Sequence, residues 1–284
     1  MDGRVIVPPP GPAPRPGQAV PGADPTLGLA LEPYLAGLAT NPEKGPVDEC
    51  GVFGIYGCAG AARVVYHALI ALQHRGQESA GIVAARGRSL TAHRGMGLVS
   101  EVFEKPETLD RLAGDVAIGH VRYSTAGASR LSNAQPIVVN TRRGGLALAH
   151  NGNLVNAFLL RRQMEEEGAI FATGVDTEVL AHLIVRSRAA TLEEAVVDAI
   201  GQVRGGYALL ILAEDRLIGL RDPHGIRPLQ LGRLDGRWVL ASESCAFDTI
   251  GAEFVREVAP GEMITISEGG KLRSQPAIRG ATPP

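Results

Sequence analysis

The stretch CGVFGIYG, residues 50–57, marks an abrupt change in the character of this 284-residue chain. Before it, 11 of the chain's 19 prolines fall within the first 49 positions. Proline fixes φ and lacks a backbone N–H, so residues 1–49 favour extended, solvated conformations over helices and strand ladders. From Cys50 onward, short apolar runs are broken by glycine, and CGVFGIYG itself is typical of a buried strand. We therefore expect residues 1–49 to be a disordered leader and residues 50–284 to form one folded domain.

The order of the expected elements indicates the fold class. Residues 61–73 carry apolar side chains at the period of an amphipathic helix, and residues 79–95 read as a strand hairpin. Further strands are expected at 115–125, 145–154, 207–222, 228–242 and 261–275, and helices at 153–167, at 176–188 and from 191 onward. Strands, then helices, then strands again predict an α+β fold with antiparallel sheets and segregated helices.

Several local signals predict how these elements begin and turn. Asp176 is expected to cap its helix, and the spacing within Thr191–Glu194 fits a capping box. Asp235-Gly236 is expected to form a type I′ hairpin turn. The string LLILAED, residues 209–215, resembles a strand ending in an acidic phosphoribose site, but the next residues contain no Gly/Thr phosphate cradle. A hairpin turn is therefore the favoured interpretation there.

Composition excludes several functional classes. The 28 basic and 30 acidic residues leave a net charge of −2 without a Lys/Arg run, which argues against nucleic acid or an anionic membrane as partner. No apolar run approaches the roughly 18 residues of a spanning helix, and no secretory signal is present, so a cytoplasmic protein is expected. The three cysteines form no C-x-x-C pair and no two histidines share helical ligand spacing, so we expect neither disulfide nor metal. His74, His120 and His150 are expected to be structural.

Cys50 is the cysteine for which a packing role is least satisfactory, because it lies where the leader meets the first strand. If the leader is removed after Glu49, Cys50 gains a free α-amine with an ordinary pKa near 8 beside its own thiol. That amine can take the thiol proton directly or through water. One residue would then supply nucleophile and base, as N-terminal threonine nucleophiles do.

Polar residues at strand exits offer the remaining parts of such a site. Asn151-Gly152 provides a side-chain amide and a backbone N–H for an oxyanion, and Arg122 could clamp a substrate carboxylate. Asp176 could accept an α-ammonium group. Each has a structural alternative, since Asn-Gly is a common turn, Arg122 could form a surface ion pair and Asp176 could merely cap its helix.

Taken together, residues 48 to about 270 resemble the glutaminase domains of the amidophosphoribosyltransferase family. The matching strings, in order, are DECGVFGIYG, ALQHRGQESAGI, GHVRYSTAGASRLSNAQPI, LAHNGNLVN, VDTEVL, RDPHGIRPLQLG and ASESCAFDTIGAEFVREVAPGEM. The resemblance implies a four-layer αββα sandwich of the N-terminal nucleophile hydrolase type and a propeptide that ends at Glu49.

The resemblance also implies roles for individual residues. Cys50 matches the nucleophile that forms a glutamyl thioester, and the pair Asn151-Gly152 matches the oxyanion hole. Among the substrate-binding positions, Arg122 and Thr125 match those that hold the glutamine carboxylate, and Asp176 matches the one that receives the α-ammonium. Arg75 matches a supporting position near the site.

The activity implied is hydrolysis of L-glutamine to glutamate and ammonia, which in the full-length enzyme converts phosphoribosyl pyrophosphate to 5-phosphoribosylamine in purine biosynthesis. Family members carry a C-terminal phosphoribosyltransferase domain that uses Mg²⁺, in many relatives with a 4Fe–4S cluster, and we expect a homo-oligomer when full length. We expect that domain to be absent here, leaving glutaminase activity and no cofactor in this chain. The alternatives are another amidotransferase such as glucosamine-6-phosphate synthase, which usually reads NAHP where residues 133–136 read NAQP, and a non-catalytic glutamine-binding module.

Overall fold

Two antiparallel sheets form the centre of the structure, a computed structural model that describes residues 50–87, 89–123 and 129–277. Within those residues the first sheet has seven strands in the order β11-β9-β10-β1-β4-β2-β3. They are β1 (Gly51–Tyr56), β2 (Ser79–Arg86), β3 (Ser89–Met96), β4 (Val116–Arg122), β9 (Gln230–Leu234), β10 (Arg237–Ala241) and β11 (Glu253–Glu257). The stretch that begins at Cys50 therefore supplies the central strand of this sheet.

The second sheet, counted over the same residues, has six strands in the order β13-β12-β8-β7-β6-β5. They are β5 (Ile137–Thr141), β6 (Gly144–Leu154), β7 (Gly205–Ala213), β8 (Leu217–Arg221), β12 (Glu262–Ser267) and β13 (Lys271–Pro276). The hairpin between β7 and β8 places Glu214 and Asp215 in a turn, which confirms that interpretation of the acidic pair.

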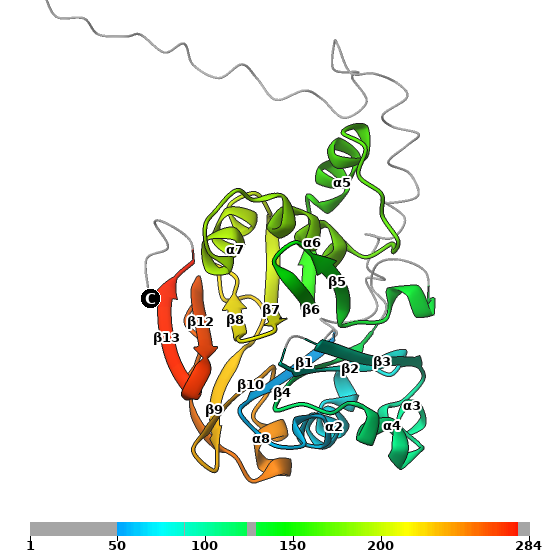
Figure 1. The fold of residues 1–284 in the computed structure, drawn as a ribbon, viewed down its shortest axis with the longest axis vertical. Coiled ribbons are helices and arrows are strands. Elements are labelled where there is room, and N and C mark those ends of the chain that lie inside the picture. The colour runs from blue at the N-terminus through cyan, green and yellow to red at the C-terminus, as the bar shows by residue number, and fades with distance from the viewer. Residues whose placement is uncertain (1–49, 88, 124–128, 278–284) are drawn as a thin grey trace, which may run out of the picture. The chain divides into compact units, whose positions relative to one another are not determined.

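Helices cover the outer face of each sheet (Figure 1). The first sheet packs against α2 (Ala61–Ala71), α3 (Val99–Val102), α4 (Pro106–Arg111) and α8 (Cys245–Ile250), and the second against α6 (Asp176–Arg186) and α7 (Leu192–Ile200). The remaining helix, α5 (Ala157–Glu166), packs against α6. A third apolar cluster fills the space between the sheets. These layers confirm the α+β class and the αββα sandwich.

Both faces of β1 are apolar because each of them packs against a buried cluster. Val52 belongs to the cluster between the sheets, whereas Phe53 and Ile55 belong to the cluster beneath the helices. Successive side chains of a strand point to opposite faces, so a strand buried on both faces carries a continuous apolar run. Among the described residues, no helix is long and apolar enough to cross a membrane.

Most local predictions hold. Thr191 caps α7 in a reciprocal capping box with Glu194, and Asp235-Gly236 has the positive φ values, 47° and 79°, that a type I′ turn needs. The prediction that Asp176 is an N-cap is wrong, because Val175 takes that position and the Asp176 carboxylate turns toward β6. The helix expected from residue 153 starts at Ala157, since β6 continues through Leu154.

Candidate active site

Cys50 lies at the N-terminal end of β1 and is held there by Arg75. The Cys50 N–H donates to the Arg75 carbonyl oxygen at 3.1 Å, and Arg75 Nε donates back to the Cys50 carbonyl oxygen at 2.6 Å. The Cys50 thiol donates to the carbonyl oxygen of Tyr123 at 3.7 Å. Cys50 has a φ of 58°, in the left-handed region that non-glycine residues seldom adopt. Arg75, predicted near the substrate, thus contacts the backbone of the predicted nucleophile itself.

The guanidinium of Arg75 is almost fully buried and is paired with Glu243, which follows β10. A buried guanidinium needs an anionic partner, because an unpaired buried charge is strongly destabilising. Burial opposes ionisation of Glu243, but the hydrogen bond and the charge of Arg75, with His74, outweigh it and lower the pKa of Glu243. Glu243 therefore stays charged and fixes the arginine that holds Cys50.

Arg122 ends β4 beside Cys50, because Gly51 pairs with Val121 in the β1–β4 register. Its side chain is buried and forms an ion pair with Glu78, whose own N–H donates to the Arg122 carbonyl oxygen. Arg122 therefore does form an ion pair, but the pair is buried and not on the surface, which excludes the alternative interpretation. Thr125, predicted to assist Arg122, lies outside the described residues.

Asn151 and Gly152 lie inside β6, opposite Ala208 and Tyr207 of β7. The Asn151 side chain is fully buried, and neither of its amide atoms has a hydrogen-bond partner among the described residues. Leaving such a group unsatisfied costs about 1–3 kcal/mol. Gly152 has a φ of 141°, and a Cβ at this position would overlap the Gly206 carbonyl. The pair therefore combines an amide without a partner among the described residues and a position that only glycine fits, which a simple Asn-Gly turn does not explain.

Side chains from three other segments hold the backbone just before Asn151. His120 Nε2, on β4 of the first sheet, lies 3.0 Å from the His150 carbonyl oxygen, and the His150 N–H donates to Gln135 Oε1 at 2.8 Å. His120 thus donates to a carbonyl, as expected of a structural histidine. Burial, with the nearby charge of Arg122, lowers the pKa of His120 to about 3. This neutral histidine connects the two sheets beside Asn151.

The carboxylate of Asp176, at the start of α6, holds both ends of the same segment. Its Oδ2 accepts from the Leu154 N–H at 2.9 Å, and its Oδ1 lies 3.2 Å from His150 Nδ1. Burial would raise the pKa of Asp176, but the charge and hydrogen bond of His150 and the backbone N–H of Leu154 outweigh it and lower that pKa. Asp176 is thus charged, and both of its oxygens already have protein partners.

The structure joins most of the predicted residues into one network. Cys50 and Arg122 meet through strand pairing, and the contact between His120 and His150 connects that sheet to Asn151-Gly152 and, through His150, to Asp176. Sequence reasoning gave no role to Glu78 or Glu243 and gave His120 and His150 only a generic one. Both glutamates lie inside the strings that carry the family resemblance, which was the available signal.

Comparisons with known proteins agree with this geometry. A family model described as a glutamine amidotransferase domain matches residues 120–249, a range that includes Arg122, Asn151 and Asp176. An amidophosphoribosyltransferase of Bacillus subtilis is 52% identical over 228 residues, covering 80% of this chain and 48% of the relative. The chloroplastic amidophosphoribosyltransferase 2 of Arabidopsis thaliana is 52% identical over 253 residues, covering 87% of this chain and 45% of the relative.

Solved structures give the same result. The glutamine phosphoribosylpyrophosphate amidotransferase from B. subtilis, complexed with ADP and GMP, superposes with a TM-score of 0.77 at 49% identity over 81% of this chain and 50% of that one. A class-II domain protein from Silicibacter pomeroyi, 15% identical with a TM-score of 0.55, is similar in fold alone and is covered completely. This chain spans about half the length of the amidophosphoribosyltransferases that it matches.

The two facing sheets, the helices outside them and these matches define a glutamine amidotransferase domain of the N-terminal nucleophile hydrolase fold. Over the residues matched, the chain corresponds to the glutamine amidotransferase domain of amidophosphoribosyltransferases.

Proposed function

We propose that this domain hydrolyses the side-chain amide of L-glutamine through Cys50, after residues 1–49 have been removed. The Cys50 α-amine accepts the thiol proton, and the thiolate attacks the amide carbon. The C–N bond of the resulting tetrahedral intermediate breaks, and the nitrogen leaves as ammonia with the proton returned to it. Water then hydrolyses the glutamyl thioester to glutamate and restores the thiol.

The observation that carries the proposal is the buried amide of Asn151, which has no hydrogen-bond partner among the described residues, beside Gly152, whose φ of 141° favours glycine. A hydrogen-bond donor kept free in a dry site is poised for negative charge that develops during the reaction, and it needs no reorganisation then. We assign the oxyanion to Asn151 Nδ2 and the Gly152 N–H. His150, fixed at its N–H, carbonyl and ring, positions this pair.

The two ends of glutamine are assigned by charge. Arg122, buried beside Cys50, is the proposed carboxylate ligand together with Thr125, and Glu78 orients its guanidinium from the other side. Asp176 is the proposed ligand of the α-ammonium, and its low pKa keeps it anionic for that contact. Arg75 acts on the backbone of Cys50 and is a positioning residue.

We further propose that the ammonia converts phosphoribosyl pyrophosphate to 5-phosphoribosylamine, as the names of the matched relatives suggest. This chain spans 48% of the B. subtilis relative, and we assign the acceptor reaction to the part that it does not span. We therefore expect glutamate release from this chain, without formation of phosphoribosylamine unless the acceptor domain is supplied.

The test combines intact mass with a glutaminase assay. The purified chain is expected to lose residues 1–49 and to release glutamate and ammonia in equal amounts. Cys50→Ala should abolish release, whereas Cys58→Ala, a matched change at a half-exposed cysteine, should not. Asn151→Ala should lower kcat by about 100- to 1000-fold, the cost of one oxyanion donor.

Retention of the leader together with absent turnover would support a glutamine-binding module instead. Turnover that survives Cys50→Ala would refute the thioester mechanism. Ammonia transfer to a hexose phosphate, rather than to phosphoribosyl pyrophosphate, by the protein with its acceptor domain would favour the glucosamine-6-phosphate synthase alternative.

A further inference from the structure

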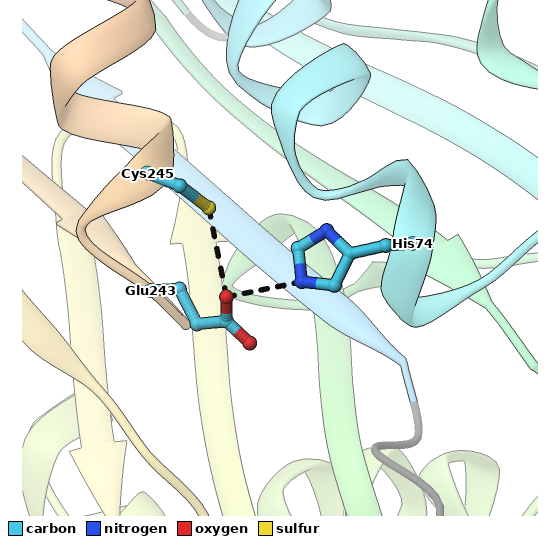
Figure 2. A group of neighbouring side chains, drawn as sticks. All are labelled: His74, Glu243 and Cys245. Atoms are coloured by element: carbon cyan, nitrogen blue, oxygen red, sulfur yellow. Dashed lines mark hydrogen bonds and ion pairs between the residues drawn. The ribbon is translucent and has the colours of Figure 1, made fainter.

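Three potential metal ligands meet on the outer side of the first sheet, where the end of α2 faces the start of α8 (Figure 2). They are His74, in the short 3₁₀ turn Gln73–Arg75, Glu243, in the link after β10, and Cys245, the first residue of α8. Their ligand atoms all lie within 4.8 Å of one another. None of the proposed chemical steps uses His74 or Cys245.

The distances are close to those of a tetrahedral site. His74 Nε2 lies 3.0 Å from Glu243 Oε2, and Cys245 Sγ lies 3.5 Å from the same oxygen. Ligands placed tetrahedrally about 2.0 Å (N, O) and 2.3 Å (S) from a zinc ion are separated by roughly 3.3–3.6 Å. The two separations from the Glu243 oxygen are thus close to the tetrahedral values, and the third, between His74 Nε2 and Cys245 Sγ, is at most 4.8 Å.

Contacts behind two of the ligands orient them toward this centre. His74 Nδ1 lies 3.0 Å from the Ala71 carbonyl oxygen, which favours the tautomer whose lone pair is on Nε2. Nε2 faces the Glu243 carboxylate at 3.0 Å and is therefore the ring nitrogen available to a metal ion shared with that carboxylate. The other oxygen of Glu243 is paired with Arg75, so the carboxylate cannot turn away.

The donor set selects the kind of cation. One imidazole nitrogen, one carboxylate oxygen and one thiolate sulfur suit a borderline divalent ion such as Zn²⁺, whereas Mg²⁺ and Ca²⁺ prefer oxygen donors alone. The side chain of His74 is 53% exposed, so the centre is open to solvent. A water molecule can complete the four-coordinate shell.

We propose that His74, Glu243 and Cys245 form a binding site for a divalent transition-metal ion, with Zn²⁺ as its expected occupant. On binding, the Cys245 thiol releases its proton to solvent and the thiolate coordinates the ion. Arg75 remains paired with the second oxygen of Glu243 and orients that ligand. The metal would join the 3₁₀ turn that follows α2 to the start of α8, at the residue that fixes Arg75, although it takes no part in the glutaminase steps.

The test uses the full chain carrying Cys50→Ala, because an exposed N-terminal cysteine would itself bind metal. Zn²⁺ is titrated in competition with a chromogenic chelator, and Co²⁺ is used as a spectroscopic probe. We expect one equivalent of bound metal, with the near-ultraviolet charge-transfer band of a Co²⁺–thiolate bond. Adding Cys245→Ala should remove that band, and adding Cys58→Ala should leave it unchanged.

A second pair of variants tests the imidazole without altering a thiol. Loss of a hydrogen-bond partner behind a metal ligand costs about 10- to 100-fold in affinity, so loss of the ligand itself in His74→Gln should weaken Zn²⁺ binding by about 100-fold or more. His67→Gln, at an exposed histidine on α2, should have no effect. Both positions are exposed, so these variants are expected to fold.

A charge-transfer band that persists in Cys245→Ala, or equal Zn²⁺ affinity in His74→Gln and its parent, would overturn the proposal. Absence of any Co²⁺–thiolate band would do so as well, and would assign the contact of His74 with Glu243 to a simple ion pair. Because the measurements use a protein without its nucleophile, they are independent of the proposed glutaminase activity.

Discussion

Acidification from pH 7 to pH 5 should destabilise this domain through His120. Burial, reinforced by the charges of Arg122 and His150, lowers the pKa of His120 to about 3, against an ordinary value near 6.5. Between these values the unfolded chain binds a proton that the folded chain does not, so stability rises with pH. Over the interval from pH 7 to pH 5 the loss is about 2 kcal/mol, the free energy of protonating an ordinary histidine in the unfolded state.

The assay is urea unfolding of the parent and of His120→Gln at pH 7, 6 and 5. Glutamine can still donate to the His150 carbonyl but does not titrate, so the variant should lose about 2 kcal/mol less than the parent over this interval. The other histidines and the chemical denaturant affect both proteins alike. The low pKa values of Asp176 and Glu243 place their stability losses at more acidic pH. Equal losses in parent and variant would refute a neutral, buried His120.

Three further predictions concern the framework of the site. Gly152→Ala should abolish glutamate release and lower the urea midpoint of unfolding, because the added Cβ would overlap strand β7. Gly168→Ala is the control: this glycine also has a positive φ, but its Cβ would lie in open space, so glutamate release should be unchanged. Glu243→Gln should lower the free energy of unfolding in urea by about 3 kcal/mol and lower kcat, because it removes the ion-pair partner of the buried Arg75 guanidinium. Unchanged kinetics in this variant would argue against positioning of Cys50 through Arg75. Thr191→Ala should cost about 1 kcal/mol in thermal unfolding without altering kcat, because only the cap of α7 is lost.

Local sequence signals predicted the structure correctly where a short segment depends only on its own residues. The capping box at Thr191 and the Asp235-Gly236 turn depend on neighbouring residues, and both hold. The N-cap prediction for Asp176 failed because a distant partner prevailed: its carboxylate binds the Leu154 N–H and His150 on β6 instead of its own helix. Local preference is a weak guide once a buried polar group has a better partner elsewhere.

The candidate residues of the site could also be chosen from sequence, because charge complementarity to the proposed substrate, glutamine, requires only the right residue types. What the sequence could not provide is the order of the strands. Arg122 lies beside Cys50 because β4 pairs with β1 in the register Gly51–Val121, and the paired residues are 70 positions apart in the sequence. The unsatisfied state of Asn151 is likewise visible only after β6 has been buried between its neighbours.

The position of Glu243 follows from the register of β1 with its other neighbour, β10. Phe53 pairs with Ala241 in the antiparallel β1–β10 pair, and the Ser242 N–H donates to the Val52 carbonyl oxygen, so the chain leaves β10 toward the start of β1, where the proposed nucleophile lies. A carboxylate placed there can reach Arg75 with one oxygen while the other faces His74 and Cys245. Burial of Arg75 requires the first contact, and that contact directs the second oxygen outward. The proposed metal site is therefore a geometric consequence of how the arginine that holds Cys50 is neutralised, and a substitution of Glu243 should affect both sites together.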